Sequence, residues 1–256
     1  MTLDSLTFTG GNGAGFSGGE GGAILNENGA LALNRCTLFG NSAQFRGGTI
    51  SGLAGLLTLT QCTLSGNSVT AGGVNNGGGA IFSLGNLSLT HCTISGNSTA
   101  PQNQGGGIIN AGPATLAYCI VAENSVGFGG VGPDIKNEST LTRLGANLIL
   151  ASVDANGGSS SGPTAISAPA KVSPLGSYGG DTPTRALLPG SPARNAATGS
   201  PIGSDQRGFP IVGPPDLGAY EAGTARTFAI WAIENIGVGA TFDGDADGDG
   251  RKNGLE

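Results

Sequence analysis

Charge is scarce in this chain, and its scarcity argues against several classes of function. Only 11% of the 256 residues are charged, and the net charge at pH 7 is −6, whereas roughly 25% of the residues of a typical soluble domain are charged. Sites for nucleic acid or for an anionic membrane surface need clustered Lys and Arg. We therefore expect neither partner. From Gly47 to Ala122 the chain has no Asp, Glu, Lys or Arg at all.

Long apolar runs and a leader segment are missing as well. No apolar run reaches the roughly 18 residues that a membrane helix needs, so we expect no membrane span in this chain. Met1 is followed by LDSLTFTG, which has neither the basic region nor the apolar region of a signal peptide. The chain begins inside a repeat unit without a capping segment, and we interpret it as a fragment of a longer protein.

Glycine and one repeated octapeptide are what the chain has in abundance. Glycine accounts for 50 residues, and the octapeptide occurs as CTLFGNSA, CTLSGNSV, CTISGNST and CIVAENSV, starting at Cys36, Cys62, Cys92 and Cys119. The cysteines are 26, 30 and 27 residues apart. A period between 20 and 50 residues is typical of a solenoid, in which each repeat stacks on its neighbours.

Three further columns keep the same period. They are an isoleucine column (Ile24, Ile50, Ile81, Ile109, Ile135), a leucine column (Leu33, Leu59, Leu89, Leu116) and an asparagine column (Asn41, Asn67, Asn97, Asn124). A weaker copy places Leu3 and Leu6 at the positions of Leu33 and Cys36, and another weak copy follows with Leu141 and Leu144. We expect the apolar columns to stack inside and the asparagines to form an amide ladder at a corner.

Each unit reads as short strands joined by sharp corners. In LLTLTQCTL the apolar parity changes near Thr60 and Gln61, which indicates a corner because successive strand residues face opposite sides. The glycine run before each isoleucine indicates another corner. Three short strands per turn without a helix predict an all-β parallel β-helix of about six rungs over residues 1–150, each rung adding about 4.8 Å.

The four cysteines have two interpretations. They share one apolar column, which favours reduced thiols buried as small apolar side chains. Two disulfides are the alternative, because neighbouring rungs bring Cα atoms within disulfide range. A metal site is disfavoured, since there is no CxxC pair and His91, next to Cys92, should point outward.

The repeats resemble the right-handed β-helix repeats of bacterial surface proteins, namely polymorphic outer-membrane proteins and pectate-lyase-like solenoids. The segments PLGSYGGDTPTRALLPGSPARNAA and SDQRGFPIVGPPDLGAYE resemble the end of the choice-of-anchor Q type of surface domain. That resemblance implies that residues 151–222 form an irregular cap, and that the protein is secreted or attached to a bacterial surface. We expect Asp205, Arg207 and Asp216 to form a hydrogen-bonded lid over the open end of the solenoid, with an active site there as the alternative.

Two positions depart from the choice-of-anchor Q pattern. Arg185 stands where histidine is expected, and Arg194-Asn195 stand where an isoleucine–aspartate pair is usual. The resemblance transfers no catalytic role to either position.

The tail, residues 223–256, carries a sharp metal-binding motif. From Asp245 onward the sequence DADGDGRKNGLE fits the twelve-residue calcium loop D-x-D-x-D-G-x5-E. The predicted Ca²⁺ ligands are Asp245, Asp247, Asp249, the carbonyl of Arg251, Asn253 and Glu256. The preceding FAIWAIENIG predicts a short helix. The pair resembles the EF-hand-like, dockerin-like and thrombospondin type-3-like modules of bacterial secreted proteins, in which calcium is structural; a solvated acidic tail is the alternative.

Three functions remain open from the sequence. A lyase or glycosidase needs several carboxylates, or a base beside calcium, in one cleft, and Glu123 with Asp134 and Lys136 is the nearest grouping. We therefore predict no catalytic residues. A neutral surface of Thr, Ser, Asn and Gln suits binding to a polysaccharide or cell-wall polymer, or a stalk without a ligand. Exposed aromatic rings would favour sugar binding, and Tyr118 is expected to point outward. We expect a monomer.

Overall fold

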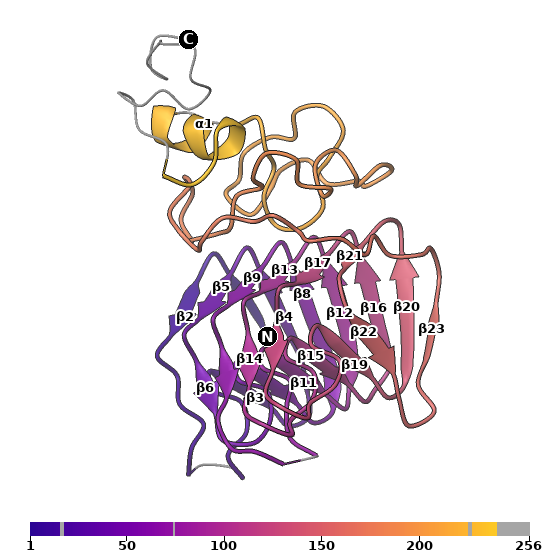
Figure 1. The fold of residues 1–256 in the computed structure, drawn as a ribbon. Coiled ribbons are helices and arrows are strands. Elements are labelled where there is room, and N and C mark those ends of the chain that lie inside the picture. Colours follow the sequence, from indigo (N-terminus) through magenta and orange to yellow (C-terminus); the bar gives the residue numbers. More distant parts are fainter. Residues whose placement is uncertain (16–17, 74, 225–226, 240–256) are drawn as a thin grey trace.

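The computed structural model describes residues 1–15, 18–73, 75–224 and 227–239. It shows a parallel β-helix followed by an irregular segment and one short helix (Figure 1). Each turn of the chain adds one strand to each of up to four parallel sheets. This confirms the right-handed parallel β-helix predicted from the repeats.

We number the sheets I to IV in the order in which the chain visits them. Sheet I contains β1 (Thr2–Asp4), β4 (Gly29–Asn34), β8 (Gly55–Thr60), β12 (Asn86–Thr90), β16 (Ala114–Ala117), β20 (Thr140–Leu144) and β23 (Ser159–Ser161). Sheet II contains β2 (Thr7–Thr9), β5 (Thr37–Phe39), β9 (Thr63–Ser65), β13 (Thr93–Ser95), β17 (Ile120–Ala122) and β21 (Leu148–Ile149).

The other two sheets complete the turn. Sheet III contains β6 (Ser42–Ala43), β10 (Ser68–Val69), β14 (Ser98–Thr99) and β18 (Ser125–Val126). Sheet IV contains β3 (Ile24–Asn26), β7 (Ile50–Gly52), β11 (Ile81–Ser83), β15 (Ile108–Asn110), β19 (Ile135–Asn137) and β22 (Ser152–Asp154). Sheet III is an addition to the three predicted strands per turn, because strands of two residues are too short to show an alternating pattern.

The corners lie where the parity change and the glycine runs place them. Gln61 and His91 have φ of 53° and 48°, in the left-handed region, and they separate sheet I from sheet II. Gly47 and Gly78, with φ of 60° and 67°, precede sheet IV. A Cβ at Gly78 would lie 2.3 Å from the carbonyl oxygen of Ile81, so this corner needs glycine for space as well as for conformation.

The register of the columns is confirmed in most rungs and corrected in two. Ile24, Ile50, Ile81 and Ile135 share one column of sheet IV, but its fourth member is Ile108. Ile109, predicted there, lies opposite Phe82 and faces outward. Ile108 and Ile109 are adjacent isoleucines, and either would suit an inward apolar position, so the sequence alone could not choose between them.

The second correction concerns the last repeat. Leu116 pairs with Arg143, so Leu141 and Leu144 do not continue the leucine and cysteine columns. Leu144 is instead 52% exposed. At the first repeat the prediction is confirmed, because Leu3 pairs with Leu33.

The interior holds the predicted apolar columns. Leu59, Leu89, Cys62 and Cys92 are fully buried in one core cluster with the inward isoleucines. All four cysteines are free thiols. The Cys62 thiol donates to the carbonyl oxygen of Leu33 one rung away, at 3.4 Å. The structure therefore favours the interpretation of the cysteines as small buried side chains.

The asparagine column forms the expected amide ladder. The Nδ2 of Asn41 donates to the Oδ1 of Asn67 at 3.0 Å, and Asn67 donates in the same way to Asn97 at 2.8 Å. Asn97 continues the ladder to Asn124 at 2.9 Å. The donors all point toward the next rung, so the ladder has a direction.

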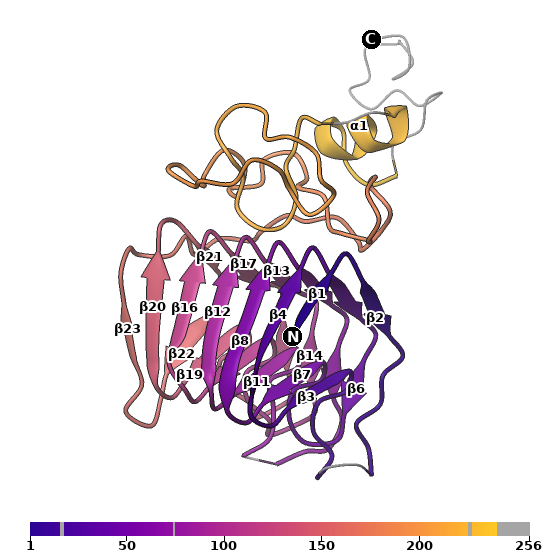
Figure 2. The ribbon, with the colours of Figure 1, turned by 180° about the vertical axis from the view of Figure 1, so that it is seen from behind.

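The solenoid continues beyond residue 150. Strands β22 and β23 pair with β19 and β20, and Ile166 forms a bridge with Leu148. The chain then turns back, and residues 167–224, which we call the C-terminal region, run along one side of the solenoid above sheet II (Figures 1 and 2). The region is irregular, as predicted, but it covers a side of the solenoid and not the open end.

A second core joins this region to the solenoid. Ile120 and Leu148 on the outer face of sheet II pack with Ala186, Leu217 and Tyr220. Helix α1 (Phe228–Asn235), where the sequence predicted a helix, packs on the far side of the region. In the described part of the chain no helix combines the length and the apolar character needed to cross a membrane.

Candidate functional site

The acidic residues of the solenoid were the first candidates for chemistry, and Asp134 has a structural role. It is buried, and its Oδ1 accepts hydrogen bonds from the Nδ2 and the backbone N–H of Asn124 at 2.9 and 3.1 Å. Its Oδ2 accepts from the N–H of Ala151 at 2.8 Å. Burial raises the pKa of this carboxyl group. Asp134 therefore ends the asparagine ladder with a group that can only accept when it is ionised.

Glu123 and Lys136, the other members of that predicted grouping, have different partners. Glu123 lies 3.9 Å from the guanidinium of Arg185 in the C-terminal region and accepts from Ser95 at 3.3 Å. Lys136 is on the outer face of sheet IV, where it forms an ion pair with Glu138. The three side chains do not converge on one cleft.

A hollow of about 190 Å³ lies on the outer face of sheet IV. Phe82 and Ile109 line it, and Lys136 and Glu138 stand beside them. The guanidinium of Arg46 lies 4.9 Å from the centre of the Phe82 ring. Phe82 is only 5% exposed, so this ring is covered and offers no stacking surface for a sugar.

One acceptor in this hollow lacks a hydrogen bond. The Oε1 of Gln104, which also lines the hollow, is buried without a partner among the described residues. The volume is several times the roughly 30 Å³ share of one water molecule. The hollow therefore has room for ordered water or for one small hydroxylated group.

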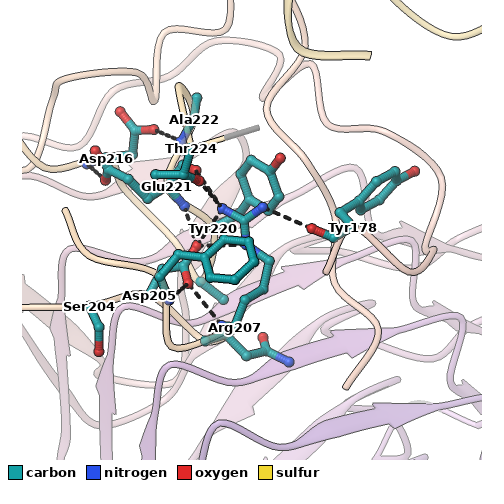
Figure 3. Close-up of polar contacts among 12 residues, drawn as sticks. Tyr178, Ser204, Asp205, Arg207, Asp216, Tyr220, Glu221, Ala222 and Thr224 are labelled. Carbon is teal, nitrogen blue, oxygen red and sulfur yellow. Dashed lines mark hydrogen bonds and ion pairs between the residues drawn. The ribbon is translucent and has the colours of Figure 1, made fainter. Parts of the chain in front are cut away.

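The densest polar cluster lies in the C-terminal region around Arg207 (Figure 3). The Asp205–Arg207 ion pair spans 2.6 Å, with side-chain exposures of 2% and 0%. The guanidinium also donates to the carbonyl oxygens of Tyr178 and Glu221 at 3.0 and 2.6 Å and lies 3.6 Å from the centre of the Tyr220 ring. These contacts, with that to the Thr224 hydroxyl at 2.6 Å, occupy most of the five N–H donors of an arginine.

Two more buried carboxylates flank this cluster. Asp216 accepts from the backbone N–H groups of Asn195 and Ala222 at 2.5 and 2.7 Å. Glu221 accepts from the N–H groups of Asp216 and Val212 at 3.0 and 3.4 Å. Burial, with the neighbouring Asp216 charge, raises the pKa of Glu221 to about 7.

The predicted lid residues are therefore hydrogen-bonded, as expected, and each holds loop backbone. Asp205 and Asp216 accept mainly from main-chain N–H groups, and Arg207 donates to two main-chain carbonyls, to the Asp205 carboxylate and to the Thr224 hydroxyl. Carboxylates engaged in this way are ordered by the fold and have few lone pairs left for a substrate. The cluster organises a long segment that has little regular secondary structure.

His91 lies where the C-terminal region meets the solenoid. It points away from the solenoid core, as predicted, but it is fully buried by this region. Its Nδ1 lies 3.2 Å from the carbonyl oxygen of Gly218 and its Nε2 lies 2.6 Å from the hydroxyl of Ser200. Tyr118 stacks on the ring at 5.1 Å. Burial lowers the pKa of His91, which favours the neutral imidazole. The His91 ring thereby connects the solenoid to the C-terminal region.

The two departures from the choice-of-anchor Q pattern also make structural contacts. Arg185 donates from Nε to the hydroxyl of Ser65 in sheet II at 3.0 Å. Arg194 donates to the carbonyl oxygens of Leu187 and of Glu234 in α1. Asn195 has φ of 55°, a conformation that asparagine tolerates better than most residues.

Sequence analysis missed Gln206 and Glu234, which connect the parts of the molecule. The Nε2 of Gln206 donates to the hydroxyls of Thr37 and Thr182 at 2.8 and 2.9 Å, and its Oε1 accepts from Thr63 at 2.6 Å. Glu234 accepts from the Tyr220 hydroxyl. One feature of the sequence could have indicated that this face is covered. Ile120 occupies the outward position of sheet II that holds threonine in the preceding rungs, and an apolar residue at an outward position indicates burial by another segment.

The predicted calcium ligands Asp245, Asp247, Asp249, Arg251, Asn253 and Glu256 lie outside the described residues, so the site stays a prediction. Within the described ranges no group of three or more His, Cys, Asp or Glu side chains is placed to hold a metal ion.

Comparisons with protein-family models, with curated proteins and with solved structures gave no match for this chain.

Proposed function

We propose that this chain is a non-catalytic, secreted or surface-attached β-helix protein that binds a polysaccharide or another cell-wall polymer. The observation that carries the proposal is the use of the carboxylates. Asp4 pairs with Arg35 at 2.7 Å, Glu20 with Arg46 at 3.4 Å, and Asp134 ends a ladder. What the solenoid offers to a partner is therefore mostly neutral hydroxyl and amide groups, which suit hydrogen bonding to sugars.

A stalk without a ligand is the second candidate, and the aromatic side chains favour it. Sugar sites commonly use exposed rings, but Phe82 is covered by Arg46 and Tyr118 stacks on His91. Phe128 is 93% exposed and stands on a loop, and no ring of the described residues is in contact with it. A binding surface on this chain therefore depends on hydrogen bonds more than on ring stacking.

Incubation of the chain with a polysaccharide array in millimolar calcium tests these alternatives. Both retained protein and released oligosaccharide are measured. We expect retention without release. Released oligosaccharide would instead assign the chain to the polysaccharide lyases or glycosidases and overturn the proposal, and absence of both signals would favour the stalk.

The tail is proposed to bind one structural Ca²⁺ through Asp245, Asp247, Asp249, Arg251, Asn253 and Glu256. Folding and binding are linked in such loops. We expect calorimetry with calcium to show heat of binding and a higher melting temperature. Asp247→Ala should remove both effects, whereas Asp243→Ala, just outside the predicted loop, should retain them. Equal binding by the Asp247→Ala variant would refute the site.

A further inference from the structure

The outer face of sheet I carries a column of hydroxyl groups. Parallel pairing aligns outward positions of successive rungs, and the column reads Thr2, Ala32, Thr58, Ser88, Thr115, Thr142 and Ser161. Ala32 is the single member without a hydroxyl group. Successive rungs are separated by about 4.8 Å because backbone hydrogen bonds fix that distance. We call this set the hydroxyl column.

The central part of the hydroxyl column is exposed to solvent among the described residues. No other segment crosses sheet I in Figure 2, and the central members Thr58, Ser88 and Thr115 are half-buried, as expected on a flat uncovered sheet. No described residue forms a hydrogen bond with these three hydroxyls. The neighbouring outward column begins with Asp4 and continues with Asn34, Thr60, Thr90, Ala117 and Leu144. The outward positions of β4 to β16 therefore carry no charge.

The same molecule shows what a column of this kind can bind. On sheet II the outward residues Thr37, Thr63 and Thr93 occupy successive rungs. Thr37 donates to the carbonyl oxygen of Pro183, Thr63 donates to Gln206 at 2.6 Å, and Thr93 accepts from the N–H of Ala219 at 3.0 Å. A hydroxyl from each of three rungs thus contacts the C-terminal region, which crosses the strands along the solenoid axis. The C-terminal region thus covers sheet II, whereas no segment among the described residues covers sheet I.

We propose that the hydroxyl column binds an extended, neutral polysaccharide chain that lies along the solenoid axis with about one sugar per rung. The proposal rests on the function proposed above and assigns it to one face. A chain of equatorially linked pyranoses advances by about one rung height for each sugar, so its hydroxyl groups meet those of the column in step. Neutral sugars match the uncharged outward positions of β4 to β16, and many weak contacts in register add up along the chain. A coiled or sharply bent glycan loses this register.

The test compares the parent chain with two double variants. Ser88→Ala with Thr115→Val removes two central hydroxyls and preserves side-chain volume at position 115. Ser98→Ala with Thr70→Val makes the same changes at and next to sheet III. Binding is measured by co-sedimentation with cellulose, chitin and β-mannan as extended chains and with amylose as a coiled one. Thermal melts establish that each variant is folded, and single Ser88→Ala provides a milder second variant.

We expect the parent to bind at least one extended glycan in preference to amylose, the sheet I variant to bind it at least ten-fold more weakly, and the sheet III variant to bind it like the parent. Equal weakening by both variants, or none by the sheet I variant, would overturn the assignment of this face and leave the proposed function standing. A preference for amylose would also overturn the assignment of this face to an extended glycan. Failure of the parent to bind any glycan would overturn both proposals.

Discussion

At the scale of single residues, the asparagine ladder shows how a repeated side chain becomes a directional structure. Each amide donates from Nδ2 to the Oδ1 of the next rung. Each Oδ1 also accepts from the backbone N–H of the preceding rung, as when the Asn67 N–H donates to the Oδ1 of Asn97 at 3.0 Å. Such a chain must end on a group that accepts twice and donates nothing. Asp134 meets this condition, and in sheet IV Asp154 ends a shorter amide ladder by accepting from Asn137 at 2.8 Å.

Asp134→Asn should destabilise the protein although the side chain keeps its shape. An amide at this position turns an NH₂ group either toward the donors of Asn124 or toward the N–H of Ala151. One buried donor is then left without an acceptor, which costs about 1–3 kcal/mol. Urea denaturation measures the loss of free energy of unfolding. Asp181→Asn, at an exposed position, is the matched control and should change stability little; equal stability of both variants would contradict the ladder-end role.

Glu221 should make stability depend on pH. Its folded-state pKa is raised from 4.5 to about 7 by burial and by the charge of Asp216. The folded state therefore holds this proton more tightly, and the associated stability is present below pH 4.5 and is lost as the pH rises through about 7. Melting temperatures measured from pH 5 to 8 should decline, and Glu221→Gln should flatten the decline. An unchanged slope in this variant would assign the pH effect to other groups.

At the scale of elements, short strands and one short helix persist because their neighbours hold them. Strands of two or three residues, such as β10 and β13, are paired on both sides within their sheets. Helix α1 has eight residues, too few to be stable alone in water. Ile230 and Ala232 are buried, and Glu234 accepts hydrogen bonds from the Tyr220 hydroxyl and from the N–H of Gly223, the latter at 3.0 Å.

Glu234→Ala should release α1 while leaving the solenoid folded. The change removes both acceptors, and the Tyr220 hydroxyl loses its buried partner. Hydrogen exchange of the α1 amides should become at least ten-fold faster, with exchange in β8 and β12 unchanged. Asn235→Ala, at an exposed position of the same helix, is the control. Unaltered exchange in the Glu234→Ala variant would show that the Glu234 side chain is not needed to hold the helix.

At the scale of the whole molecule, the C-terminal region adds a layer on the outer face of sheet II. It forms a second core on sheet II and contacts one corner or strand after another, from Thr37 to Tyr118. This arrangement covers the hydroxyls of sheet II and leaves those of sheet I open (Figures 1 and 2). The two faces of one repeat thereby acquire different roles.

Gln206→Ala should loosen this region as a unit. The side chain donates to Thr37 and Thr182 and accepts from Thr63, all in a buried setting, so its loss leaves hydroxyls without partners. Limited proteolysis should cut residues 167–224 several-fold faster than in the parent, with the solenoid intact. Gln44→Ala, next to β6 on another side of the solenoid, is the matched control and should keep the parental cleavage rate. Equal rates in all three proteins would refute the fastening role.

The sequence by itself determined the solenoid. Stacking requires each rung to repeat the previous one, so the columns that contain Cys62, Asn67 and Leu59 predict the period, the corners and the interior. The apolar pattern after Thr227 predicts the short helix. The sequence could not choose between Ile108 and Ile109, because either satisfies an inward apolar position.

Only the tertiary structure decided which polar positions are buried. Outward threonines such as Thr63 in sheet II and Thr58 in sheet I have the same pattern within a rung, yet the first is fully buried and the second is open. The difference arises from the C-terminal region, more than one hundred residues away in the chain, which returns along sheet II. Contacts at such separation, like those of His91 with Ser200 and Gly218, have no periodic pattern in the sequence, so the repeats could not predict them.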